Sequence, residues 1–191
     1  MRLLSTVLVP LALVGALAWN AVTDHRARGG DVADTASSAA HHCHARGTGL
    51  LVLPDPRCTP GRTNPDVTQA TIGRTICIRG WTRTVRPPES VTEPIKRRLI
   101  GLYRDYAGSR LPSYELDHLI PLELGGAPSD ERNLWPEVDY AGISSQTYYR
   151  NPKDRLERIL NRRVCAGQMS LARARALIAS DWVAAYRRYV R

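Results

Sequence analysis

The segment from Tyr114 to Gly126, "YELDHLIPLELGG", contains two ionisable side chains inside an apolar, strand-like run. Asp117 and His118 are neighbours, and the run from Leu116 continues to Leu122. Adjacent side chains of an extended strand point to opposite faces, so these two groups cannot both enter one apolar core. At a strand end or a bulge, both can reach a shared ion or substrate. The pair therefore favours a functional site, and a satisfied histidine beside a turn aspartate is the alternative.

Periodic apolar residues predict three helices around this segment. The first begins at Thr92 as the N-cap, has Pro94 in its first turn and ends at Gly108. Two more are predicted at about residues 152–164 and 171–190, the last capped by Ser170. The residues expected to face the core are Ile95, Leu99, Leu102, Tyr103 and Tyr106, then Leu156, Ile159 and Leu160, then Leu177, Ile178, Trp182, Ala185 and Tyr186.

Short strands are predicted in three further places. One follows Leu50 in "LLVLPDPRCTPG", and another is expected at Asn133 to Trp135. The stretch "TICIRGWTRTVRPP", residues 75–88, alternates β-branched and aromatic positions and predicts a strand or a bent pair of strands. Helices and short strands together predict a small, mostly helical α+β domain at residues 50–191.

The N-terminus has the layout of an export signal. Arg2 precedes an apolar run to Trp19 that ends in the small-residue pattern Ala16-Leu17-Ala18, so residues 1–21 are predicted to be a signal peptide. An uncleaved membrane anchor is the alternative, although the run is shorter than the roughly 20 apolar residues of a typical span. Residues 22–49 are small and polar and predict a flexible linker. The protein is therefore expected to be secreted or extracytoplasmic, with membrane attachment only if the segment is uncleaved.

Four cysteines, Cys43, Cys58, Cys77 and Cys165, can pair completely in an oxidising compartment. Three pairings are open from sequence alone. We expect Cys43 with Cys58, which closes a short loop, and Cys77 with Cys165, which joins distant segments. The run "HHCH" at residues 41–44 offers zinc ligands as an alternative, but its Gly/Ala/Ser-rich surroundings and the lack of a second ligand pair favour a solvated linker.

Positive charge is concentrated at the C-terminal end of the chain. Residues 150–191 hold 11 Lys and Arg against 3 Asp and Glu, whereas residues 19–149 hold 15 of each. A polyanionic partner would meet this end first. A generally solubilising surface is the alternative explanation.

The pattern "DHLIPLELGG" followed by "NLWP" resembles the HNH nuclease family, whose hallmark is a ββα-metal finger. The likeness covers Tyr114 to Cys165, and its core positions are Asp117-His118, Pro121-Leu122, Gly125-Gly126 and Asn133-Leu134. More loosely, "CTPG", "TICIRGWTRTVRPP" and "KDRLERILNRRVCAG" look like exported bacterial proteins that carry this signature. The resemblance implies an HNH finger embedded in the α+β domain, held by packing and disulfides because no Cys-x-x-Cys pairs flank it.

The resemblance also implies a role for each matching residue. His118 would be the general base that takes a proton from water, since an imidazole titrates near neutral pH. Asp117 would bind a divalent cation through its carboxylate, and the cation would stabilise charge on the phosphate. Asn133 would pin the loop between the strands and so orient the histidine, with an ordinary turn asparagine as the alternative.

The third signature position departs from the family pattern. The nearest match to its metal ligand is Asn151, but Asn151-Pro152 also has the form of an N-cap followed by proline at the first helical position. Ligand and cap are therefore both open, and Asp154 would substitute as ligand if Asn151 only caps. Carboxylate and amide oxygens favour Mg²⁺, with Mn²⁺ as an alternative, whereas His118 as a ligand would favour Zn²⁺.

Basic residues of the following helix are predicted to lie on its outward face and to contact phosphates: Lys153, Arg155, Arg158, Arg162 and Arg163. No base-reading motif accompanies them, so contacts would be made with the nucleic-acid backbone and cleavage would have little sequence specificity. The leading hypothesis is a secreted, metal-dependent HNH-type endonuclease acting on DNA, with RNA as the other substrate. The alternative is a secreted nucleic-acid or cell-envelope binding module that keeps the finger as a scaffold, and no stable protein partner is evident.

Overall fold

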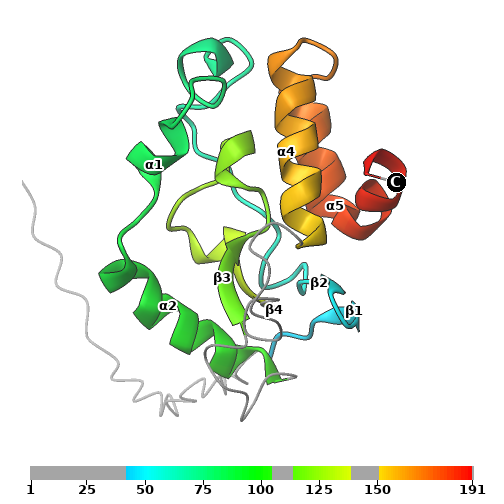
Figure 1. Ribbon diagram of the computed structural model, residues 1–191. Helices are drawn as coiled ribbons and strands as arrows, with labels where there is room; N and C mark the ends of the chain where they lie inside the picture. The colour runs from blue at the N-terminus through cyan, green and yellow to red at the C-terminus, as the bar shows by residue number, and fades with distance from the viewer. Residues whose placement is uncertain (1–41, 105–113, 139–150, 191) are drawn as a thin grey trace, which may run out of the picture. The chain divides into compact units, whose positions relative to one another are not determined.

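The computed structural model describes residues 42–104, 114–138 and 151–190. In chain order these residues form two short hairpins and a set of helices (Figure 1). The strands are β1 (Arg46–Thr48), β2 (Leu51–Leu53), β3 (Tyr114–His118) and β4 (Leu134–Val138). The α-helices are α1 (Trp81–Val85), α2 (Glu89–Leu102), α4 (Pro152–Cys165) and α5 (Leu171–Tyr189), and short 3₁₀ turns are η1 (Ile72–Arg74), η4 (Leu122–Leu124) and η5 (Glu131–Asn133). The predicted α+β class is confirmed.

The β3–β4 hairpin separates the two ionisable neighbours onto opposite faces. The strands are antiparallel, with Asp117 opposite Trp135 and His118 opposite Leu134. Because side chains alternate along a strand, Asp117 shares a face with Trp135, while His118 shares the other face with Leu134 and Leu116. The expectation from the alternation of side chains therefore holds, and the two groups can meet only around the end of β3.

Helices cover the hairpin on both sides (Figure 1). Helix α2 packs Ile95 and Leu99 against Leu134, on the face that carries His118. Helix α4 lies on the other side, where Asn151 donates a hydrogen bond from Nδ2 to Glu115 at 3.2 Å. The hairpin is thus held between an apolar contact on one face and polar contacts on the other.

Helices α4 and α5 pack together and contribute nine of the twenty buried residues that the described ranges place in the main core. The predicted boundaries are confirmed to within a residue, and Ser170 caps α5 by accepting a hydrogen bond from the Arg173 amide. The Trp182 indole donates to the Val52 carbonyl at 2.9 Å, which ties α5 to β2. Among the predicted core residues, Leu156, Leu160, Ile178, Trp182 and Ala185 are buried, while Ile159, Leu177 and Tyr186 are partly exposed.

Both predicted disulfides are confirmed. Cys43 pairs with Cys58 and Cys77 pairs with Cys165. Cys43 therefore has no thiolate to offer a metal, which removes it from the alternative zinc site at residues 41–44. Two disulfides in one small domain fit an extracellular protein better than a cytosolic one.

The N-terminal predictions meet the structure only in part. The predicted signal peptide and most of the predicted linker lie outside the described residues. Residues 42–49 belong to the folded domain, because β1 pairs with β2 and Cys43 is buried. The fold therefore begins before Leu50, and the linker prediction was too long. Within the described ranges, no helix is long and apolar enough to cross a membrane.

The predicted strand at residues 75–88 is wrong. Consecutive turns lead there into α1, and Gly80 at the helix start has a φ of 85°. Ile76 is buried whereas Ile78 is 52% exposed, although the two would share one face of a strand. The alternation of β-branched residues was therefore not a strand signal here, because turn residues and Gly80 set the local backbone instead.

The boundaries of three other elements differ from prediction. Helix α2 begins at Glu89 and Pro94 lies inside it; the Thr92 hydroxyl bonds to the Glu89 carbonyl instead of capping. The helix ends at Leu102, and the predicted end at Gly108 lies outside the described residues. Strand β3 is shorter than expected because residues 122–124 turn into η4. Strand β4 starts one residue later than predicted and continues to Val138.

A candidate active site at the end of β3

A small acidic cavity of about 90 Å³ lies where β3 ends. Asp117 and His118 both line it, although their side chains leave the strand on opposite faces. Asp154 from α4 and Glu123 from η4 add two carboxylates. The structure thus brings together Asp117, His118 and Asp154, three of the residues predicted from sequence.

His118 is held in one tautomer by the backbone. It is 7% exposed, and its Nε2 lies 3.0 Å from the Pro128 carbonyl oxygen. A carbonyl can only accept, so Nε2 carries the proton and Nδ1 carries the lone pair. Burial lowers the pKa of His118 against the opposing effect of the Asp117 carboxylate. The imidazole is therefore neutral at neutral pH, which is the form that can accept a proton.

Asn133 ties the ends of the loop that follows β3. Its side chain is fully buried, and its Oδ1 accepts from the Ile120 amide at 3.0 Å. Its Nδ2 donates to the carbonyls of Ile120 at 3.0 Å and Ala127 at 3.1 Å. Ala127 directly precedes Pro128, so this carboxamide fixes the backbone that holds the histidine ring. Asn133 itself does not line the cavity, so it acts as a positioning residue.

The loop passes so close to itself that a side chain at Gly126 is excluded. A Cβ on Gly126 would lie 1.7 Å from the Ile120 carbonyl oxygen and 2.8 Å from Asn133 Nδ2. Gly125 has a φ of 68°, a conformation that favours glycine. The paired glycines are therefore a steric requirement of the loop that Asn133 pins.

The sequence predicted Lys153 on the outer face of α4, and this prediction is wrong. The side chain lies inside the protein. It is 1% exposed, and its ammonium forms ion pairs with Asp117 and Glu157. It also donates to the His118 carbonyl at 2.8 Å. The lysine thus joins α4 to the end of β3 and cannot contact a phosphate in solution.

The carboxyl groups around Lys153 have pKa values shifted in different directions by burial and by the charges beside them. Burial alone would raise the pKa of Asp117, but the Lys153 charge together with hydrogen bonds from Glu137 and Lys153 outweighs burial and holds that pKa below its usual value. Burial raises the pKa of Glu137 and of Glu157 well above the usual range. Glu137, on β4, shares a hydrogen bond with Asp117. Asp117 is therefore the carboxylate of this group that stays ionised.

Asp154 faces the same cavity without a counterion of its own. Burial, followed by repulsion from the Asp117 carboxylate, raises the pKa of Asp154 to about 6. The positive charges of Lys153 and Arg158 oppose this rise but do not cancel it. The cavity therefore has a negative potential that an added cation would relieve.

Asn151 is an N-cap, which settles one of the two roles left open by the sequence. Its Oδ1 accepts from the Lys153 amide at 2.9 Å, and its Nδ2 donates to Glu115. Pro152 occupies the first helical position, as predicted. Asn151 does not line the cavity. Both polar atoms of its carboxamide are thus engaged away from Asp117.

The four predicted arginines of α4 do not share one face. Arg155 and Arg163 lie over the rings of Tyr186 and Tyr189 on α5, at 6.0 and 5.3 Å from the ring centres. The charge of Arg158 opposes the rise in the pKa of Asp154, and Arg162 is exposed and lines a neighbouring hollow. None of the four lines the cavity itself.

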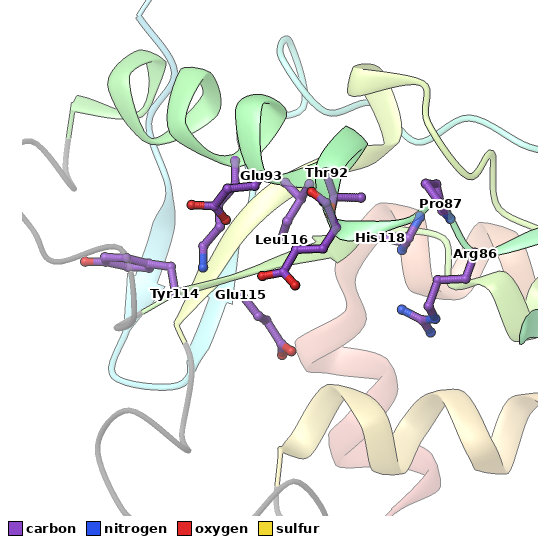
Figure 2. Close-up of a pocket in the computed structure, with 10 residues that line it drawn as sticks. Arg86, Pro87, Thr92, Glu93, Tyr114, Glu115, Leu116 and His118 are labelled. Atoms are coloured by element: carbon purple, nitrogen blue, oxygen red, sulfur yellow. The ribbon is translucent and has the colours of Figure 1, made fainter.

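A second hollow, a groove of about 380 Å³, leads from the cavity between α2 and β3. Figure 2 shows Tyr114 at one end of it and Arg86 with Pro87 at the other, beside His118. Arg86 lines both the groove and the cavity and forms no ion pair within the described residues. The sequence did not single it out, because it lies in a stretch interpreted as a strand end.

The donor atoms of the cavity fit a hard divalent cation. Asp117 and Asp154 supply carboxylate oxygens, and all four cysteines are in disulfides. Within the described residues, no three His, Cys, Asp or Glu side chains converge as a metal cage. Mg²⁺ needs only one or two protein carboxylates because it keeps several waters and binds substrate phosphates. The oxygen-rich lining suits Mg²⁺ or Mn²⁺ better than Zn²⁺.

No family model, no curated protein and no solved structure matches this chain significantly. The chemistry of the cavity is therefore the main guide to function. It combines a neutral, backbone-oriented histidine with the carboxyl groups of Asp117, at the end of β3, and Asp154, on α4.

Proposed function

We propose that the protein is a metal-dependent endonuclease of the HNH type that hydrolyses phosphodiester bonds. The observation that carries this proposal is the shared cavity of His118, Asp117 and Asp154, with His118 Nδ1 free of the proton that Nε2 carries. The element order β3, β4, α4 supports it, because a ββα unit is the scaffold that the motif implies. The oriented imidazole and the carboxylates supply a base and cation ligands in one place.

Each residue has a defined part in the proposed reaction. His118 accepts a proton from the attacking water at Nδ1, and the Pro128 carbonyl stabilises the resulting charge through Nε2. Asp117 and Asp154 would hold a divalent cation, which would supply positive charge to stabilise the phosphate and the leaving oxygen. Lys153 keeps Asp117 ionised and fixes its position. Asn133 keeps the loop in the shape that orients His118.

Phosphate contacts come from arginines around the cavity. Arg86 lines it, while Arg158 and Arg162 approach from α4. No base-reading motif accompanies these arginines, so they contact the phosphate backbone and the cleavage has little sequence preference. DNA is the proposed substrate and RNA the alternative, and the disulfides suit action outside the cytoplasm.

A binding module without catalysis is the second candidate. Two observations favour it: Asn151 is a cap, and the Lys153 ammonium already occupies one side of Asp117. A buried ammonium at that position neutralises the carboxylate that would otherwise attract a cation. Such a module would bind nucleic acid or the cell envelope through its arginines.

Cleavage of supercoiled plasmid distinguishes the two candidates. We expect the purified protein to nick and linearise plasmid with Mg²⁺ or Mn²⁺, and EDTA to stop the reaction. Zn²⁺ is included as a third metal because it would be favoured if His118 were a metal ligand and not the base. Cleavage that is equally fast in EDTA would rule out the metal-dependent mechanism, and no cleavage with any metal would leave the binding module.

Replacement of Asp154 tests the cation site through stability. The folded-state pKa of about 6 lies above that of an unfolded aspartate, so the ionised carboxylate destabilises the fold, fully above pH 6, and the penalty disappears as pH falls toward 4. Asp154→Asn should therefore be more stable by about 1–2 kcal/mol at pH 8 without metal, after discounting for the partial exposure of Asp154. The two proteins should be equally stable at pH 4.

Added Mg²⁺ should make the wild type more stable than Asp154→Asn. Calorimetric melting at pH 8 should show a rise in Tm with Mg²⁺ for the wild type and little change for Asp154→Asn, because a ligand that binds only the folded state stabilises it. Asp66→Asn, at an exposed position, is the control and should behave as wild type. Equal Mg²⁺ responses of wild type and Asp154→Asn would exclude Asp154 as a ligand.

A further inference from the structure

A third hollow lies on the side of the cavity away from the groove. It has a volume of about 370 Å³ and is formed between residues 76–82 and the C-terminal half of α4. A volume in this range suits a small organic ligand or one unit of a polymer. Apart from Arg162 and the disulfide, none of the functional residues predicted from sequence lies there, and no role has yet been assigned to the hollow itself.

The lining combines an apolar platform with unpaired positive charge. Trp81 is half-buried and Ile78 is 52% exposed, one of two large apolar side chains so exposed in the described parts of the chain. Arg79 and Arg162 are exposed at its edge, and no carboxylate of the described residues pairs with either. An aromatic face with guanidinium groups beside it is the chemistry that binds a nucleobase together with its phosphate.

The walls of the hollow are fixed to each other. The Cys77–Cys165 disulfide joins residues 76–82 to the end of α4. Asn161 Nδ2 lies 3.3 Å from the Ile76 carbonyl and 2.8 Å from the Glu123 carbonyl. A surface held in this way loses little conformational freedom when it binds a ligand. The hollow is therefore present before a ligand arrives.

The hollow adjoins the acidic cavity. Glu123 lines both. The Glu123 charge would repel a phosphate placed at the junction, so a phosphate in the hollow is best placed at its outer edge, near Arg79 and Arg162. A strand bound there would pass next to His118.

We propose that this hollow is a subsite for one unpaired nucleotide of a single-stranded nucleic acid, next to the bond that is cleaved. The base stacks on Trp81 and Ile78, and the adjoining phosphate contacts Arg79 and Arg162. This inference rests on the proposed nuclease function and narrows its substrate. In a duplex the faces of the bases are covered by their neighbours, so only an unpaired base can reach Trp81. Single strands are therefore bound in preference to duplexes.

Binding of a fluorescein-labelled dT₁₀ oligonucleotide to the full chain, measured by anisotropy in EDTA, tests the subsite without cleavage. Trp81→Leu should weaken binding roughly 5- to 150-fold, as expected for the loss of one stacked base, and Trp81→Tyr should restore most of it. The double variant Arg79→Ala with Arg162→Ala should make the slope of log K against log salt concentration shallower by about one to two. Arg187→Ala, at an exposed position on α5, is the matched control and should leave the affinity unchanged.

Two comparisons identify the bound group. A 10-residue abasic oligonucleotide should bind wild type and Trp81→Leu equally, and a duplex of the same length should be insensitive to Trp81→Leu. Unchanged dT₁₀ affinity in a folded Trp81→Leu protein, or an equal loss for the duplex, would overturn the subsite. If the protein cleaves plasmid but its binding does not depend on Trp81, the subsite is refuted and the nuclease function stands. If binding depends on Trp81 but no cleavage occurs, the subsite stands and the nuclease function is refuted.

Discussion

His118→Ala is expected to lower plasmid cleavage by about 10²- to 10⁴-fold, the contribution usually made by a general base. The reason is that His118 lines the cavity and its Nδ1 is unprotonated, because Nε2 is committed to the Pro128 carbonyl. Single-turnover cleavage with excess enzyme measures the effect, because it reports the chemical step. His44→Ala, at an exposed histidine, is the matched control and should cleave at the wild-type rate.

The pH dependence of the wild type provides an independent check on that role. Burial lowers the pKa of His118, so the imidazole is unprotonated at neutral pH and becomes protonated only below its ordinary value of 6.5. Cleavage should therefore be independent of pH from about 7 to 8 and fall as the pH drops below about 6.5, where protonation of Asp154 adds to the loss. A His118→Ala protein that melts like wild type and still cleaves at the wild-type rate would eliminate His118 as the base.

Lys153→Met is expected to destabilise the fold by about 3–5 kcal/mol at neutral pH, the usual cost of leaving a buried charge without its partner. Burial opposes the ionised form of Asp117, and the Lys153 charge is the largest of the effects that together overcome it; Glu157 loses its hydrogen-bond donor as well. Urea unfolding followed by circular dichroism measures the change. Lys96→Met on α2 is the matched control, because Lys96 is partly exposed and should cost less than about 1 kcal/mol.

The cost of Lys153→Met should depend on pH in a defined direction. The pKa of Asp117 is depressed in the folded protein, so the stabilisation from the ion pair is present above pH 4, the range of an unfolded aspartate, and is lost as the pH falls through the lower folded value. Without Lys153, burial raises the pKa of Asp117, so the variant should regain stability as falling pH protonates this carboxyl. The difference between wild type and variant should therefore be largest near pH 8 and shrink as the pH falls toward 4 and below. If the difference persisted unchanged at pH 2.5, the destabilisation would come from lost packing of the Lys153 aliphatic stem and not from the lost ion pair.

The elements predicted correctly are those whose signal is local. Helices α4 and α5 follow from apolar periodicity with Asn151 and Ser170 as caps, and both disulfides follow from chain separation and compartment. The strand prediction for residues 75–88 was wrong because the alternation of β-branched residues does not reveal that Gly80 takes a left-handed φ. Turn geometry of this kind depends on a few backbone angles and not on a periodic pattern.

The site was predicted less completely than the fold. Asp117, His118 and Asn133 stand in one recognisable motif, and the structure places them around one loop. Lys153 was assigned to the surface because charge alone suggested exposure, yet Glu157 at i+4 and the carboxylates of the hairpin hold it inside. Partners on another element cannot be read from a helical pattern. The i,i+4 pairing with Glu157 was the available sign, although most such pairs lie on helix surfaces.

The contact between Gly126 and Ile120 restricts which changes in chain length this loop can accept. Its residues are close-packed against the Asn133 carboxamide, and a Cβ at Gly126 would overlap the Ile120 carbonyl. An inserted or deleted residue between Ile120 and Asn133 would displace the Ala127 carbonyl from Nδ2. Most surface loops tolerate insertions, but here the number of residues between histidine and asparagine is itself fixed. Related sequences should therefore vary in length outside this segment, before β3 or between β4 and α4.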